Sequence, residues 1–308
     1  MIARIQQLLT LGILACAIVL LIVLWETSHT AAWAVFFGIL MSHSIVLAMQ
    51  FAALPWVNAA DAAPRATYHQ LLRAWIREAA AAAQVFCWWQ PFCARRVSDQ
   101  LRCEAASRGR RGVVLVHGFL CNRAVWMHWL QELERRQVPF IAVNLEPVFG
   151  SIDSYIQILD KAISDMRLAT GRPPLLVCHS MGGLAARAWY QASGAQDSAI
   201  HGIVTIASPH QGTRISDRVP SLPGLVNANQ MRHGSRWLAA LAQKETAAQR
   251  GRFICYYSNC DNIVMPASTA RLEGAENRFV AGLPHVAMAL DAGIMRETMA
   301  LLDDASSR

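Results

Sequence analysis

The first 56 residues contain two long runs of apolar side chains without a charge. Residues 8–25 form the first run and residues 31–56 form the second, with only the short polar loop 26–30 between them. At about 1.5 Å per residue, a helix over the first run is just long enough to cross the hydrocarbon core of a bilayer, and the second run is longer. The pattern predicts a transmembrane helical hairpin over residues 1–56.

Other interpretations of these two runs stay open. The first run also resembles a cleaved signal, or a lipoprotein signal that ends at Cys16, although apolar residues continue past Cys16 and a second run follows. A hairpin buried inside a soluble protein is a further possibility. Ser42 and His43, within the second run, suit a helix contact or a polar intramembrane site.

Residues 57–111 are expected to form a connector with one amphipathic helix. Over residues 67–89, apolar side chains recur at helical spacing, namely Leu71, Leu72, Trp75, Ile76, Ala79 and Ala83. This helix is expected to lie on the bilayer or to pack on the following domain, and the pattern does not decide between the two. The loop 107–112, SRGRRG, is the expected domain boundary.

From residue 112 onward, short apolar strands alternate with longer helical stretches. Strands are predicted over residues 113–116, 140–144, 175–178, 200–207, 252–258 and 277–280, and helices over 123–136, 152–169, 183–192, 235–249 and 285–302. Such alternation produces right-handed crossovers and a mainly parallel sheet with helices on both faces. The pattern predicts one α/β domain over residues 112–308.

The composition indicates a basic protein with a high content of hydrophobic residues. Hydrophobic residues make up 54% of the 308 residues, and the formal net charge is +7. The region 61–111 holds nine arginines against four acidic residues, a basic band that suits anionic lipid headgroups. There is neither a basic motif interleaved with aromatic residues nor a zinc-type spacing of cysteine and histidine. We therefore expect no nucleic-acid partner and no metal.

The positions of the arginines predict the membrane topology. Arg4 precedes the first apolar run, the loop 26–30 has no Lys or Arg, and Arg65, Arg73 and Arg77 follow the second run. The positive-inside rule then places both ends of the hairpin in the cytoplasm. We expect an inner-membrane protein with two transmembrane helices, a cytoplasmic α/β domain and mostly reduced cysteines.

The candidate chemistry centres on residues 175–184, LLVCHSMGGL. A strand ends at Ser180, and Gly182 and Gly183 open a helix, which is the pattern of a nucleophile elbow. Close approach of strand and helix at such a serine requires small neighbours. Cys178 stands where the G-x-S-x-G pattern has its first glycine, and cysteine is small. We expect this thiol to be buried and inert, with redox sensitivity as the alternative.

An acid and a base follow Ser180 in the order that a serine nucleophile requires. Asp261 comes after the strand 252–258, and His285 comes after the strand 277–280. Both therefore lie at carboxyl ends of strands, where open α/β sheets place their sites. The backbone N–H groups of Met181 and of Phe119, in VHGFL, are expected to stabilise an oxyanion.

Other side chains compete for these roles. Asp291 is a rival acid, and His210 and His233 are rival bases. Position at a strand end favours Asp261, and chain order favours His285. His117 is expected to brace the loop that carries Phe119, and His179 is expected to line the elbow.

Together these pieces resemble the α/β-hydrolase superfamily, particularly bacterial lipases and esterases with a short sheet. The resembling segments are VLVHGFL, CHSMGG, IASPHQGT, SNCDNIVMP and LPHVAM, which span about residues 112–302. The resemblance implies an α/β-hydrolase fold and a triad of Ser180, Asp261 and His285 that works without a cofactor, with Phe119 and Met181 as oxyanion donors. It also implies a small lid within residues 209–236.

The sequence thus predicts a membrane-anchored serine hydrolase, a lipase or esterase that cleaves lipid-like carboxylic esters through an acyl-enzyme. A thioesterase, a lipid deacylase or an acyltransferase would use the same triad. A catalytically silent, hydrolase-like binding module is an alternative of another class, and the missing elbow glycine is its only indication. The expected partners are a lipid or other apolar ester substrate and the membrane.

Overall fold

A parallel sheet organises the chain from residue 113 onward. The computed structural model describes residues 1–101, 110–193, 199–218 and 224–303. Its six strands lie in the order β2-β1-β3-β4-β5-β6, and every neighbouring pair is parallel. The strands are β1 (Val113–Val116), β2 (Phe140–Ala142), β3 (Leu175–His179), β4 (Gly202–Ile206), β5 (Phe253–Tyr257) and β6 (Glu276–Phe279). All six predicted strands are present, so the prediction of a parallel α/β sheet is confirmed.

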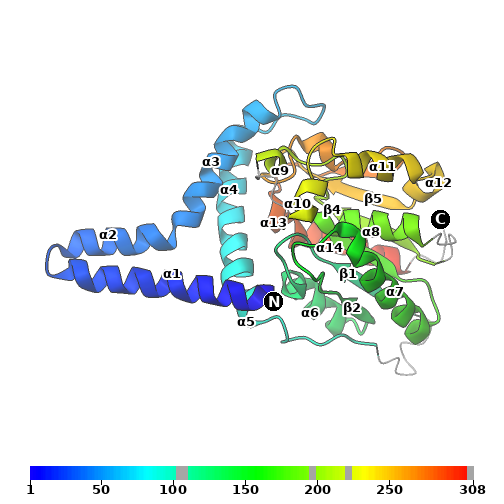
Figure 1. Cartoon of the computed structure of the whole chain (residues 1–308), viewed down its shortest axis with the longest axis horizontal. Coiled ribbons are helices and arrows are strands. Elements are labelled where there is room, and N and C mark those ends of the chain that lie inside the picture. Colours follow the sequence, from blue (N-terminus) through cyan, green and yellow to red (C-terminus); the bar gives the residue numbers. More distant parts are fainter. Residues whose placement is uncertain (102–109, 194–198, 219–223, 304–308) are drawn as a thin grey trace.

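Helices cover both faces of this sheet (Figure 1). Successive residues of β1 enter two different buried clusters, with Val113 and Leu115 in one and Val114 and Val116 in the other. Strands buried on both faces are typical of parallel sheets. The covering helices are α6 (Met127–Arg135), α13 (His285–Ala289) and α14 (Ala292–Asp303) in the first cluster, and α7 (Ile156–Thr170), α8 (Met181–Ala192) and α11 (Arg236–Lys244) in the second.

The predicted helices differ from the observed ones at their ends and in their continuity. Those predicted over 123–136 and 152–169 each begin with a 3-10 turn, Arg123–Trp126 and Ile152–Tyr155. The stretch 235–249 divides into α11 and α12 (Ala247–Arg250), because Glu245 turns inward to pair with the buried Arg187, 2.7 Å away. The stretch 285–302 divides into α13 and α14.

The N-terminal apolar runs form helices of which those over residues 2–40 project away from the body, whereas the helix over residues 42–57 packs beside the connector helix (Figure 1). Helix α1 (Ile2–Trp25) lies beside α2 (His29–Leu40), and α3 (Ser42–Val57) continues at 58° to α2. Within the described residues, only α1 is by itself long and apolar enough to cross a membrane, whereas α2 and α3 reach that length as a bent pair. The predicted second span, 31–56, is therefore not one straight helix. At the bend, the Ser42 hydroxyl donates to the Ile39 carbonyl, which satisfies one of the backbone groups that the break releases.

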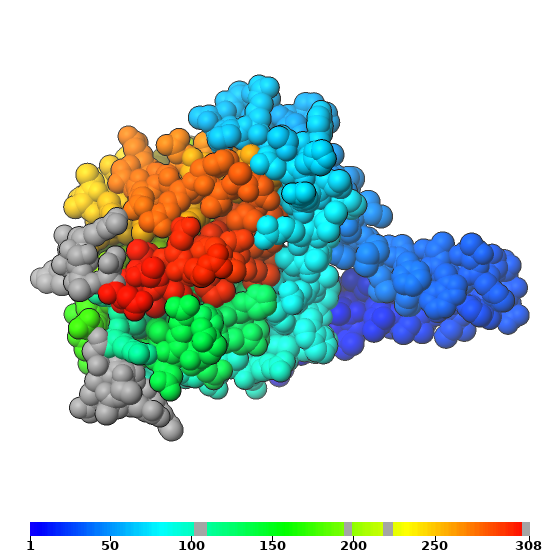
Figure 2. All heavy atoms as spheres, turned by 180° about the vertical axis from the view of Figure 1, so that it is seen from behind, coloured from blue at the N-terminus to red at the C-terminus, as the bar shows by residue number. Residues whose placement is uncertain are grey.

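The connector helix α4 (Tyr68–Ala82) stands between the hairpin and the body (Figures 1 and 2). It continues as a π-helix, Ala83–Trp89, and as the short α5 (Gln90–Phe92). Val85 and Trp89 belong to the same buried cluster as Leu115 of the sheet. The connector thus shares the core of the body. The expected boundary at 107–112 lies partly outside the described residues.

Helix α4 packs on the body through a face that differs from the predicted one. Its buried side chains are Leu71, Ala74, Glu78 and Ala81. Leu72 and Ile76, which the predicted apolar face includes, are 52% and 57% exposed. The helix therefore packs on the body with one face and presents apolar side chains on the other.

The predicted lid segment, 209–236, contains two short helices, α9 (Arg214–Arg218) and α10 (Val226–Gln230), and its residues 219–223 lie outside the described ranges. Asn227 donates to the Val148 carbonyl at 2.8 Å, and the Gln230 side chain accepts from the N–H of Ile152 at 2.8 Å. Helix α10 is therefore tied to the segment between β2 and α7. That the segment acts as a lid stays a prediction.

Candidate active site

Ser180 occupies a strained turn between β3 and α8. Its backbone φ of 55° and ψ of −128° lie where a residue with a side chain is rarely found. The two glycines that follow permit this turn, since a Cβ on Gly182 would collide with the Val116 carbonyl and a Cβ on Gly183 with the Ser208 side chain. These contacts give the geometry of a nucleophile elbow.

Cys178, the departure from the elbow pattern, is fully buried in the apolar cluster beneath α8. Burial raises the pKa of its thiol, so the group remains protonated and unreactive near neutral pH. The small side chain fits the place of the missing glycine.

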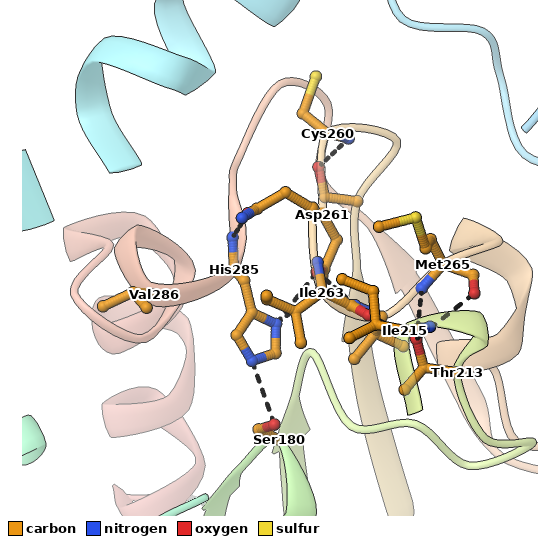
Figure 3. Close-up of polar contacts among 12 residues, drawn as sticks. Ser180, Thr213, Ile215, Cys260, Asp261, Ile263, Met265, His285 and Val286 are labelled. Carbon is orange, nitrogen blue, oxygen red and sulfur yellow. Dashed lines mark hydrogen bonds and ion pairs between the residues drawn. The ribbon is translucent and has the colours of Figure 1, made fainter. Parts of the chain in front are cut away.

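The structure brings together Ser180, His285 and Asp261 (Figure 3). The Nε2 atom of His285 lies 3.1 Å from Ser180 Oγ, and its Nδ1 atom lies 3.1 Å from both carboxylate oxygens of Asp261. All three side chains are buried, although Ser180 retains 8% exposure. Since Asp261 can only accept at Nδ1, that nitrogen carries the proton and Nε2 is free to accept the serine proton.

Hydrogen bonds fix both partners of this pair. One oxygen of Asp261 accepts the N–H groups of Ile263 at 2.9 Å and Val264 at 2.8 Å. The N–H of His285 donates to the Asn262 side chain at 3.3 Å. The acid and the base are therefore held by the loop between β5 and β6.

Two neighbouring carboxyl groups act on the pKa of His285. Burial alone would lower the pKa of His285, but the charge of Asp261, its hydrogen bond and the charge of Glu78 outweigh burial and raise it above its ordinary value of 6.5. A general base works best when its pKa lies near the working pH.

The loop after β1, which carries Phe119, packs directly against the serine. A Cβ placed on Gly118 would lie 2.8 Å from the Cβ of Ser180. His117 braces this loop, because its Nδ1 is 2.9 Å from the Gly118 carbonyl and its Nε2 accepts from the N–H of Leu145 at 3.0 Å. Burial lowers the pKa of His117 to about 4, so the ring is neutral and can accept this bond.

The two predicted oxyanion donors flank Ser180 from different segments. The N–H of Met181 is the first in α8. Phe119 follows Gly118 in this loop, and the centroid of its ring lies 6.0 Å from that of Phe149. Their action on an oxyanion stays a prediction.

The rival residues lie elsewhere. Asp291 pairs with Arg77, and the ring of the buried His210 contacts the Thr205 hydroxyl at 3.0 Å. The backbone of His233 bonds to Asp217 in the 209–236 segment. His179 contributes in another way, since its Nε2 lies 3.1 Å from the carbonyl of His285.

Three polar residues that touch this region were not recognised from the sequence. Glu78 bonds to the backbone just after His285. The Gln6 side chain donates to the Leu120 carbonyl at 3.1 Å, next to Phe119, and the Gln90 side chain accepts from the N–H of Asn122 at 2.8 Å. All three lie before residue 112 and outside the resembling segments. Their partners lie far away in the chain, so no local pattern in the sequence marked them.

Among the described residues, no group of three or more His, Cys, Asp or Glu side chains is arranged to hold a metal ion.

Comparison with known proteins agrees with this geometry at the level of the fold. The mature form of a Bacillus licheniformis lipase matches with a TM-score of 0.55 at 16% identity, over 63% of this chain and 92% of that one. Its propeptide form matches with the same score and identity, over 65% of this chain and 51% of that one. At such identity the likeness shows the fold alone. No curated protein matches the chain. The alpha/beta hydrolase family, however, matches residues 113–302, which is more than half of the sequence, and the chain belongs to this family.

Proposed function

We propose that the chain is a membrane-anchored serine hydrolase that cleaves lipid-like carboxylic esters through an acyl-enzyme. The observation that carries the proposal is the hydrogen-bonded row from Ser180 Oγ through the His285 imidazole to Asp261, with steps of 3.1 Å, at a strained elbow. A hydroxyl, an imidazole and a carboxylate in this order form a nucleophile, a general base and the group that orients the base.

In the first half of the reaction, Ser180 Oγ attacks the ester carbonyl while His285 Nε2 takes the hydroxyl proton. Asp261 stabilises the imidazolium that forms. The N–H groups of Phe119 and Met181 donate to the oxygen of the tetrahedral intermediate. Collapse of this intermediate expels the alcohol, which takes the proton from His285, and leaves an acyl group on Ser180.

The second half repeats these steps with water. His285 Nε2 accepts a proton from water as the oxygen attacks the acyl carbonyl. The second intermediate uses the same oxyanion donors, and its collapse returns the proton to Ser180 Oγ and releases the carboxylic acid. Each proton that His285 accepts, first from Ser180 and then from water, it passes on, first to the leaving alcohol and then to Ser180 Oγ.

Exposed apolar helices support the membrane anchor. In the most apolar stretch of α1, only 6% of the residues are buried within the protein, whereas a core helix of a soluble protein would bury most of them. We assign residues 1–56 to the anchor, 57–111 to the connector and 112–308 to the hydrolase body. The basic connector favours the cytoplasmic side of an inner membrane for the body.

The connector offers a second apolar surface, here named the outer face of α4. Its members are exposed at intervals of four residues, namely Tyr68, Leu72 and Ile76. Trp88 and Phe92 are exposed further along the connector. Beside it, an apolar groove of about 470 Å³ lies between α3 and α4, and its lining includes Phe51, Trp56 and Trp75. Aromatic and aliphatic side chains on a helix flanked by arginines suit the headgroup region of a bilayer.

An activity-based probe tests the proposal. The full chain in detergent or nanodiscs should react with a fluorophosphonate at Ser180, and Ser180→Ala should not. Esters of increasing acyl length, with and without lipid vesicles, then test substrate class. A wild-type protein that the probe does not label would contradict a serine hydrolase and favour the binding module. Cleavage of water-soluble short esters alone, with indifference to lipid and detergent, would contradict a lipid-like substrate.

Product analysis separates hydrolysis from the other reactions that this triad could perform. With water as the only acceptor, hydrolysis yields the free acid. A new ester or amide in the presence of a second alcohol or amine would indicate acyl transfer, and preferential cleavage of thioesters would indicate a thioesterase.

A further inference from the structure

Glu78, on the buried face of α4, is a carboxylate that the mechanism above does not use. It is 1% exposed and lies before the segment that the family matches. Its Oε1 accepts the N–H of Val286 at 2.9 Å, and its Oε2 accepts the N–H groups of Val286 and Ala287, both at 3.1 Å. These donors belong to the first turn of α13, which begins at His285.

The first turn of α13 has no other source of such acceptors within its own segment. The N–H groups of a first helical turn have no partner inside the helix, and a side chain at the N-cap usually supplies one. The N-cap of α13 is Pro284, whose ring has no polar atom. Glu78 therefore caps α13 from another part of the chain, and its negative charge suits the positive end of the helix.

We propose that Glu78 is a positioning residue for His285, so that the connector helix holds the general base in line with the serine. The inference rests on the proposed serine mechanism. The residue His285 is held by Asp261 at its ring, by Asn262 at its N–H and by His179 at its carbonyl. Glu78 fixes the two residues that follow, which prevents the start of α13 from rotating the imidazole away from Ser180.

Glu78 also acts on His285 through its charge. Burial raises the pKa of Glu78 to about 7, so its carboxyl is negatively charged above that pH and there raises the pKa of His285. The other charged group close enough to act on Glu78 is Asp261. From the remaining elements packed on α4, His43 of α3 contacts the Ala79 carbonyl at 3.3 Å, and Arg77 points outward to Asp291. A neutral residue at position 78 should therefore lower the pKa of His285, which moves the acid limb of the kcat/KM profile to lower pH.

The test compares Glu78→Gln and Glu78→Ala with a second buried carboxylate, Glu245→Gln, in the full chain. Glu245 is also buried and accepts two hydrogen bonds, but from Arg187, away from Ser180. We expect Glu78→Gln, which keeps one acceptor oxygen, to lower kcat about tenfold with KM nearly unchanged, and Glu78→Ala to lower it further. The acid limb should move to lower pH. Glu245→Gln should lower thermal stability while the folded protein keeps its kcat and its acid limb.

Wild-type kcat and an unmoved acid limb in both Glu78 variants would overturn the inference. Amide hydrogen exchange over residues 285–289 gives a second measurement that needs no substrate. Faster exchange there in Glu78→Gln than in Glu245→Gln supports positioning, and equal exchange overturns it. If the wild type reacts with neither probe nor ester, the proposed function fails, while the exchange experiment still decides the role of Glu78.

Discussion

Arg77 on α4 and Asp291 at the start of α14 form an ion pair, with Nη2 and Oδ2 3.3 Å apart. Asp291 also accepts the N–H groups of Gly293 and Ile294, at 2.9 and 3.2 Å. This carboxylate is thus a helix cap that faces the connector. Its contacts explain both why α14 begins after a break and why Asp291 is not the partner of His285.

The two candidate acids should therefore respond differently to the same change. Asp261→Asn removes the acceptor that fixes the imidazole tautomer, and we expect kcat to fall roughly 10³- to 10⁴-fold. Asp291→Asn should change kcat by less than about threefold, because it weakens only a partly exposed ion pair and a cap. Steady-state kinetics with a soluble ester measure both, and equal losses would contradict the assignment of Asp261.

Gly118 should be intolerant of any side chain. In Gly118→Ala, the new Cβ would lie 2.8 Å from the Cβ of Ser180 and 3.2 Å from the His179 carbonyl, so the nucleophile or the donor loop must shift. We expect kcat to fall roughly a hundredfold, since small displacements of reacting groups are costly. Gly251→Ala is the matched control, because its Cβ would meet nothing closer than 3.4 Å. Similar kcat values for the two variants would contradict the close packing at Ser180.

Glu78 should make thermal stability depend on pH. Burial raises the pKa of Glu78 from 4.5 to about 7, so between these values the folded state keeps a proton that the unfolded state has released. Stability from this group is fully present below pH 4.5 and is lost as pH rises to about 7, by roughly 3 kcal/mol. Glu78→Gln should remove this dependence. Melting temperatures of wild type and variant across this range test it, and parallel curves would contradict the raised pKa.

The outer face of α4 should matter for lipid substrates only. Leu72→Glu with Ile76→Glu adds two charges to a surface that is already exposed, so folding and cleavage of soluble esters should not change. Cleavage of esters in vesicles should fall severalfold, because charged side chains resist burial among lipid chains. Leu168→Glu, at an 85% exposed position of α7 on the body, is the control. Equal activity of all variants on vesicles would argue against membrane contact through this face.

Cysteine labelling can test the orientation of the hairpin. A membrane-impermeant maleimide should label Thr27→Cys in intact cells, because residue 27 is exposed in the turn between α1 and α2. Lys161→Cys, on an exposed site of the body, should react only after the cells are opened. The wild-type chain, with its own exposed thiols at Cys16 and Cys87, sets the background. Labelling of position 161 in intact cells would place the body on the other side of the membrane.

The sequence was sufficient to predict the strands of the sheet and the position of three residues at the ends of those strands. Ser180, Asp261 and His285 each follow an apolar strand, and the ends of parallel strands meet at one edge whatever the details of the helices. The breaks in the helices were not foreseeable in the same way. The bend between α2 and α3 has neither Pro nor Gly, and Glu245 ends α11 through a partner, Arg187, that lies 58 residues away in the chain.

Glu78 shows why part of the candidate site escaped sequence reasoning. A glutamate among apolar residues on a helix usually marks the solvated side, and a contact with the backbone 208 residues away leaves no local pattern. Only the tertiary arrangement places its carboxylate under His285. Gln6 and Gln90 are similar, because their partners in the donor loop lie in a distant segment.

The sharing of one core by the connector and the sheet has an evolutionary consequence. Residues 113–302 are what the chain has in common with its family, yet Val85 and Trp89 complete the buried cluster around β1 and Glu78 caps the helix of His285. A recombination event that joined this segment to a different leader would leave apolar surface bare and two backbone donors unsatisfied. The segment that must be inherited as one piece is therefore longer than residues 113–302. We expect the connector and the body to evolve together.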